Sequence, residues 1–81
     1  MKKRILVVED NRHMADLLQV RLHKEGYEVE CVYDGVEALR AVERYAPDCM
    51  LLDWMLPKME GIEVCRQLRF QHDFPIIMIS A

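Results

Sequence analysis

The sequence predicts an α/β fold in which short strands alternate with helices in the order βαβαβαβ. Three observations predict it: short apolar runs rich in β-branched residues, helical spacing of apolar residues between those runs, and breaker residues at the joints. Such alternation is typical of a parallel sheet with right-handed crossovers. With 81 residues, 52% hydrophobic and 31% charged, the chain has the composition of one small globular domain.

The first part of the chain predicts two strands around one helix. Residues 4–8 form a continuous apolar run, which is typical of a strand buried on both faces. Apolar residues recur at helical spacing over 14–22, and Gly26 is a suitable end for that helix. Residues 27–32 alternate in polarity and predict a second strand, which closes at the turn formed by residues 34–35.

The second part continues the same alternation. Residues 38–46 have helical spacing, and Pro47 ends the helix that they predict. A third buried strand is expected over 49–52, and a loop then leads to a third helix over 62–68. The last apolar run, 76–79, predicts a fourth strand. No linker, repeat or low-complexity segment interrupts the pattern.

Charge and cysteine usage exclude several classes of function. The net charge is −3 and the basic residues are scattered, which argues against direct nucleic-acid binding. The three cysteines form no CxxC pair, so reduced thiols are expected and not a zinc site. No apolar run is long enough to cross a bilayer, and no signal-peptide cleavage region is present. We therefore expect a cytoplasmic protein that has no contact with a membrane.

Polar residues stand where three of the predicted strands end. Glu9 and Asp10 follow the first strand, Asp53 follows the third, and Ser80 follows the fourth. Taken singly they have ordinary explanations, since Asp10 or Asn11 could cap the first helix. In a sheet of strand order 2-1-3-4, however, the first and third strands are neighbours. The three carboxylates then meet at the topological switch point, where open α/β sheets place their sites.

Three carboxylates at one sheet edge repel each other unless a cation offsets their charge. Oxygen ligands suit magnesium or manganese better than zinc. Such a metal can bridge a phosphate group and neutralise its charge during in-line transfer, with Asp53 as the nucleophile that becomes an aspartyl phosphate. The Ser80 hydroxyl could hydrogen-bond a phosphoryl oxygen, although a locally bonded strand-terminal serine fits equally well.

Several segments resemble those of one known family, in order and in spacing. Residues 5–11 resemble its opening strand and acidic pair, and residues 53–57 with Gly61 resemble its phosphoacceptor strand end and loop. Residues 34–35 and 75–81 also match. The family is that of the response-regulator receiver domains of two-component signalling, and the resemblance is to receivers of winged-helix transcriptional regulators.

The resemblance implies a flavodoxin-like parallel sheet and a set of residue roles. Asp53 would be the phosphoacceptor for a sensor histidine kinase. The ligands of Mg2+ (or Mn2+) would be Glu9, Asp10, Asp53 and the backbone carbonyl of Met55, and Ser80 would be the switch hydroxyl. The chain would then not be an enzyme, and the only reaction it could promote would be its own metal-assisted phosphorylation.

The resemblance also predicts that the chain is a truncated receiver. A complete domain would have about 120 residues, so residues 1–81 are expected to lack the fourth helix, the fifth strand and the fifth helix, together with a phosphoryl-pairing lysine. Right-handed crossovers place the first helix on one face of the sheet and the other two on the opposite face. A half-bare face and an unpaired fourth strand follow, and we expect a homodimer or a segment-exchanged oligomer.

Two hypotheses of function remain open. The first is a phosphoacceptor signalling domain, and the alternative is a phosphorylation-incompetent receiver scaffold that acts as an assembly or dimerisation module. A haloacid-dehalogenase-like phosphatase needs a second aspartate where Met55 stands, and a flavin site lacks its phosphate-binding loop. The histidines, His13, His23 and His72, and the loop residue Lys58 are interpreted as solvated.

Overall fold

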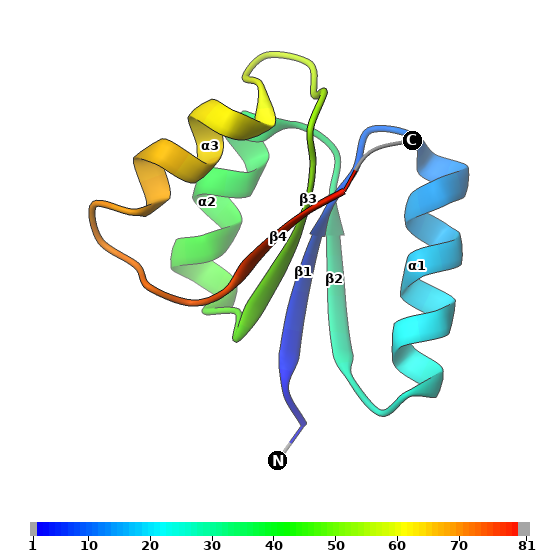
Figure 1. Ribbon diagram of the computed structural model, residues 1–81. Coiled ribbons are helices and arrows are strands. Elements are labelled where there is room, and N and C mark those ends of the chain that lie inside the picture. The colour runs from blue at the N-terminus through cyan, green and yellow to red at the C-terminus, as the bar shows by residue number, and fades with distance from the viewer. Residues whose placement is uncertain (1, 80–81) are drawn as a thin grey trace.

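The computed structural model describes residues 2–79 and shows a four-stranded parallel sheet between two helical layers (Figure 1). The strands are β1 (Arg4–Val8), β2 (Glu28–Val32), β3 (Cys49–Asp53) and β4 (Ile76–Ile79). The helices are α1 (Arg12–Lys24), α2 (Gly35–Tyr45) and α3 (Gly61–Leu68). The predicted α/β class, the alternating order and the strand order β2-β1-β3-β4 are confirmed.

The sheet is parallel throughout, and β1 lies at its centre between β2 and β3. Val8, the last residue of β1, pairs with Val32 on one side and with Leu52 on the other. The chain leaves β1 toward β2 and later returns to the opposite side of β1, so the switch point lies between β1 and β3. The residue after β1 and the last residue of β3 therefore stand beside each other.

The second helix begins earlier than the sequence pattern predicts. It covers Gly35–Tyr45, because the Asp34 side chain accepts a hydrogen bond from the Glu37 N–H at 2.8 Å and caps its first turn. The residues interpreted as a turn are thus the cap and the first helical residue. At the other end Ala46 takes a left-handed conformation with φ of 53° and closes the helix just before the proline.

The main hydrophobic core lies between the sheet and the layer formed by α2 and α3. Its largest fully buried members from the strands are Leu6, Val8, Met50 and Leu52, and Val64 of α3 packs against them. Each such side chain stabilises the fold by about 1.5–3 kcal/mol relative to an exposed one. This core fixes the ends of β1 and β3, which carry the acidic residues.

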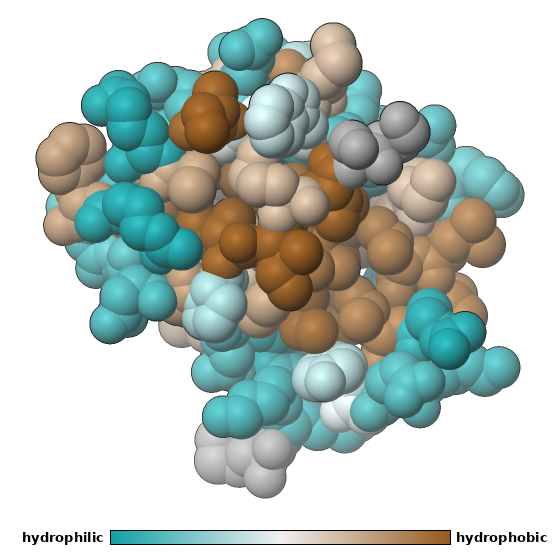
Figure 2. Space-filling view, in the orientation of Figure 1, coloured by the Kyte–Doolittle hydropathy of each residue, from teal (hydrophilic) through white to brown (hydrophobic). Residues whose placement is uncertain are grey.

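The opposite face of the sheet is covered by α1 alone among residues 2–79 (Figure 1). Ala15 is the one fully buried residue of α1. Beside the helix an apolar groove of about 450 Å³ remains, lined among others by Ile5, Leu22, Leu51 and Ile77. Figure 2 shows hydrophobic side chains gathered over the β4 edge of the molecule. The half-bare face expected from the crossovers is therefore present in the described part of the chain.

No helix within residues 2–79 combines the length and the apolar character needed to cross a membrane.

Candidate functional site

The acidic residues are held by the ends of neighbouring strands. Glu9 follows β1 directly, and its N–H donates to the Val32 carbonyl of β2 at 3.1 Å. Asp53 is the last residue of β3 and is paired with Ile79 of β4. Since both strands are buried in the sheet, their ends have little freedom to move apart. The backbone thus places the carboxylates before any ligand is present.

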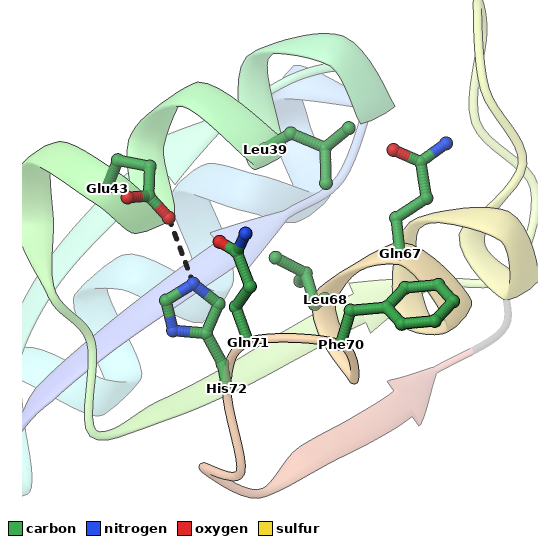
Figure 3. A pocket seen from close by; sticks show the side chains of 7 residues that line it. All are labelled: Leu39, Glu43, Gln67, Leu68, Phe70, Gln71 and His72. Carbon is green, nitrogen blue, oxygen red and sulfur yellow. Dashed lines mark hydrogen bonds and ion pairs between the residues drawn. The ribbon is translucent and has the colours of Figure 1, made fainter.

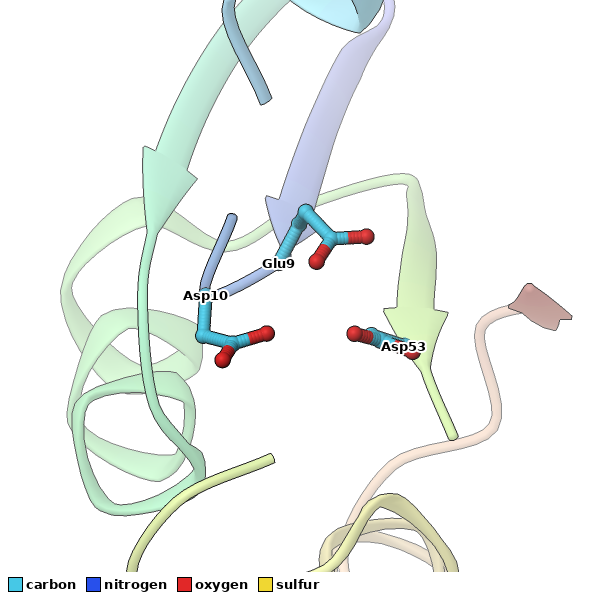
Figure 4. A group of neighbouring side chains, drawn as sticks. All are labelled: Glu9, Asp10 and Asp53. Atoms are coloured by element: carbon cyan, nitrogen blue, oxygen red, sulfur yellow. The ribbon is translucent and has the colours of Figure 1, made fainter. Parts of the chain in front are cut away.

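The structure brings the three carboxylates together. An oxygen of Glu9, one of Asp10 and one of Asp53 all lie within 4.8 Å of one another. Figure 4 shows the side chains directed toward a shared space between the end of β1 and the end of β3. Glu9 and Asp53 are buried, with 3% and 6% of their surface exposed, whereas Asp10 is exposed. The cluster is therefore open to solvent on the side of Asp10.

Among residues 2–79, no side-chain cation forms an ion pair that would offset the negative charge of this cluster. Burial raises the pKa of Glu9 to about 7, and the neighbouring Asp53 acts in the same direction. The Asn11 N–H, which donates to Glu9 Oε2 at 3.1 Å, opposes this shift without cancelling it. Within residues 2–79 no ion pair includes Glu9, Asp10 or Asp53. A cation bound at the cluster would relieve this repulsion.

The chemistry of the donor set fits Mg2+ or Mn2+. The cluster offers carboxylate oxygens only, with solvent access for the water ligands that Mg2+ retains. Met55 lies two residues after Asp53, and its N–H donates to Asp53 Oδ1 at 3.3 Å. The Met55 side chain is exposed, so the contact of this residue with Asp53 is made through its backbone. Ser80, the predicted switch hydroxyl, lies outside the described residues.

The loop between β3 and α3, residues 54–60, is packed tightly against the strand that precedes it. The Gly61 N–H donates to the Trp54 carbonyl at 3.2 Å. A Cβ atom on Gly61 would overlap the carbonyl oxygen of Asp53, so only glycine allows this approach of α3 to the end of β3. The geometry of Asp53 is therefore tied to the start of α3.

One residue of this loop makes a contact that the sequence did not predict. Lys58 is exposed, as expected, but its Nζ also lies 3.3 Å from Asp34 Oδ2, at the cap of α2. Sequence reasoning missed Asp34 as the cap of α2 and as the partner of Lys58. The signal was present, because an aspartate followed three residues later by Glu37 is the pattern of a helix cap, and Glu37 Oε1 does accept the Tyr33 N–H at 3.0 Å.

A second hollow, of about 580 Å³, lies away from the carboxylates between α2 and the end of α3 (Figure 3). It is lined by Leu39, Glu43, Gln67, Leu68, Phe70, Gln71 and His72. His72, interpreted as solvated, is instead partly buried, and its Nε2 lies 2.9 Å from Glu43 Oε2. The hollow contains no residue of the predicted site, and it is remote from the switch point of the sheet.

Comparison with known proteins gives the class. The family model described as the response regulator receiver domain matches residues 5–81. The chain therefore belongs to the response regulator receiver domain family. Domains of this family are the signalling modules of two-component response regulators, where they serve as phosphoacceptors, interact with sensor histidine kinases and generally bind Mg2+ at an acidic pocket.

Solved structures agree with this assignment. The BeF3-activated N-terminal receiver domain of Klebsiella pneumoniae RstA is 35% identical with a TM-score of 0.94, over 96% of this chain and 67% of that chain. The receiver domain of the Francisella response regulator 1452 is 30% identical with a TM-score of 0.93, over 99% and 67%. A signal receiver domain from Vibrio parahaemolyticus is 28% identical with a TM-score of 0.92, over 99% and 62%. The chain thus spans about two-thirds of the length of these structures.

Proposed function

We propose that this chain accepts a phosphoryl group from a sensor histidine kinase onto Asp53, in the cytoplasm, with Mg2+ or Mn2+ held at Glu9, Asp10, Asp53 and the Met55 carbonyl. The observation that carries the proposal is the convergence of three carboxylates, two of them buried, with no ion pair to a cation within the described part of the chain. Family membership supports the same role. The chain contacts neither nucleic acid nor membrane directly in this proposal.

The chain's own residues would contribute position and charge. The Met55 N–H donates to Oδ1 of Asp53 and would hold that oxygen in place during the transfer. An Asp53 oxygen attacks phosphorus as the P–N bond of the kinase phosphohistidine breaks, and the bonding pair remains on the imidazole nitrogen. A bound divalent cation supplies neutralisation of the phosphoryl charge. Ser80, two residues beyond Met78, is proposed to bind a phosphoryl oxygen.

The test is phosphorylation followed by intact-mass measurement. The chain is incubated with acetyl phosphate, with and without Mg2+, and we expect a Mg2+-dependent gain of one phosphoryl group. Asp53→Asn should abolish the gain, because the amide is not a nucleophile of this kind. Asp73→Asn, which removes an exposed carboxylate distant from the cluster, is the matched control and should be phosphorylated like the wild type. Equal labelling of Asp53→Asn would refute the assignment of the acceptor.

A second candidate function is favoured by the exposed β4 edge, where Ile77 is 52% exposed. In that case the chain is a receiver scaffold that pairs with a second copy and does not take up phosphate. The two candidates separate in the same experiment. A folded chain that gains no phosphoryl group under any donor condition, yet forms a stable dimer, supports the assembly function.

A further inference from the structure

An ion pair connects the loop that follows Asp53 to the start of α2. Lys58 Nζ lies 3.3 Å from Asp34 Oδ2, and Asp34 is buried while the lysine side chain is largely exposed. Lys58 has a backbone φ of 69°, a left-handed conformation that suits glycine or asparagine better than lysine. A lysine held in this conformation against a buried carboxylate indicates that its side chain has a role there.

Asp34 serves two partners at once. Its Oδ1 accepts the Glu37 N–H at 2.8 Å, which caps α2, while its Oδ2 faces Lys58. The Glu37 N–H and then Lys58 hold the pKa of Asp34 below its usual range, so the carboxylate remains charged near neutral pH. The pair therefore joins an element fixed by the core to a loop that has few buried side chains of its own.

Backbone packing at the same place leaves the loop little room. A Cβ atom on Gly35 would lie 2.5 Å from the Met59 carbonyl oxygen and 2.9 Å from Val64 Cγ2, so the start of α2 touches the loop directly. The Met59 N–H also donates to the Pro57 carbonyl at 2.7 Å, which makes a tight turn around Lys58. The second half of the loop, which begins at Lys58, is thus held against the start of α2. Lys58 is three residues after Met55.

We propose that the Asp34–Lys58 ion pair is a positioning device for residues 54–60, which holds the Met55 backbone at the carboxylate cluster and thereby sets its affinity for a divalent cation. The inference rests on the proposed function. Neither residue contacts the cation or the phosphoryl group. Without the ion pair Lys58 leaves its left-handed conformation, and the hydrogen bond from Met55 to Asp53 is made for a smaller fraction of the time.

The sign of the effect separates positioning from simple electrostatics. Lys58→Gln removes a positive charge near an acidic cluster, so Coulombic effects alone would strengthen Mg2+ binding. Loss of positioning weakens it, and outer-shell partners of metal sites typically contribute 10-fold or more to affinity, so about 10-fold is expected. Lys58→Arg retains the charge and should bind Mg2+ within about 2-fold of the wild type. Opposite predictions for one variant make the test decisive.

The experiment is a Mg2+ titration followed by the emission of Trp54, the only tryptophan and the neighbour of Asp53. Lys24→Gln is the matched control, because it removes an exposed lysine at the far end of α1. Asp34→Asn keeps an oxygen that can cap α2 and should also weaken binding about 10-fold. The double variant with Lys58→Gln should be no weaker than either single variant, because both changes remove the same ion pair.

A second readout needs no metal. Hydrogen exchange of the Met55 amide in the metal-free protein should be faster in Lys58→Gln and Asp34→Asn than in the wild type and in Lys58→Arg. Unchanged or tighter Mg2+ binding by Lys58→Gln, with wild-type binding intact, overturns the positioning role alone. Absence of Mg2+ binding by the wild type overturns the proposed metal site and this inference together. Circular dichroism establishes that each variant is folded before it is compared.

Discussion

Glu9 is buried beside Asp53 at the end of β1, and burial first, then its neighbour, raise its pKa from 4.5 to about 7. The folded protein therefore binds this proton more tightly than the unfolded chain does. In the metal-free protein, the contribution of Glu9 to the free energy of unfolding is fully present below pH 4.5 and is lost as the pH rises through 7. The loss is at most about 3.5 kcal/mol, since one pKa unit corresponds to about 1.4 kcal/mol.

Glu9→Gln should remove this dependence, because the amide has no proton to lose in that range. Urea unfolding of the wild type and the variant between about pH 4.5 and 8 gives the difference in their unfolding free energies at each pH. The contributions of groups that titrate equally in both proteins cancel in this difference. We expect the variant to gain stability relative to the wild type as the pH rises. Saturating Mg2+ should reduce that gain by stabilising the charged wild-type cluster. A difference that stays constant with pH would contradict the burial argument for Glu9.

At the scale of residues, sequence reasoning identified candidate ligands but not their environment. Glu9, Asp10 and Asp53 could be selected because parallel strands end at a common edge, and the structure places their oxygens together. The burial of Glu9 could not be inferred, since it depends on how neighbouring strands cover it. The partnership of Lys58 with Asp34 joins positions 24 residues apart, and nothing local specifies it. The local pattern predicts which residues stand at the strand ends, whereas their burial and ion pairs depend on the tertiary structure.

At the scale of elements, the approach of α3 to β3 depends on one glycine. A Cβ on Gly61 would overlap the Asp53 carbonyl oxygen and lie 3.1 Å from that of Trp54, and backbone atoms of a buried strand cannot move away easily. Gly61→Ala should therefore lower the unfolding free energy by about 1–3 kcal/mol, as overpacking does. It should also weaken the Mg2+ response of Trp54, because α3 and its loop must shift.

Gly26→Ala is the control for this prediction. Gly26 has φ of 96°, so alanine is strained there, yet no heavy atom lies within 4 Å of the added Cβ. Its cost should be about 1–2 kcal/mol from the backbone alone, with an unchanged response of Trp54 to Mg2+. Urea unfolding and metal titration of both variants distinguish steric overlap at the site from a general loss of stability. Equal metal responses in the two variants would show that α3 can retreat without disturbing Asp53.

The strands were more predictable than the helix starts, for a physical reason. A strand buried on both faces, such as β1, needs a continuous apolar run, and the partly exposed β4 carries such a run as well. Both strands begin and end where those runs do. Helix starts depend on capping. Because Asp34 caps α2, the helix begins at Gly35, which is three residues before Ala38, the first apolar position that the pattern marks. The pattern of apolar residues thus locates the core-facing turns of a helix but not its first turn.

At the scale of the whole molecule, the two faces of the sheet are unequal. Two helices enclose a continuous core on one face, while α1 is the only described helix on the other, beside the groove of about 450 Å³. The strand order and right-handed crossovers make this asymmetry predictable from the order of elements. The chain spans about two-thirds of the length of its solved relatives.

An unpaired apolar edge favours association with a second copy, because β4 pairs with β3 alone among the described strands. We expect a homodimer or segment-exchanged oligomer at micromolar concentration, and Ile77→Lys should shift it toward monomer by placing a charge on that edge. Val20→Lys, which makes the same change at an exposed position of α1, should leave the dimer intact. Size exclusion with light scattering measures the molar mass of each. A wild-type chain that is monodisperse as a monomer would show that the exposed β4 edge does not cause association in solution. It would remove the support for the assembly function. Phosphoacceptance at Asp53 would still be tested separately.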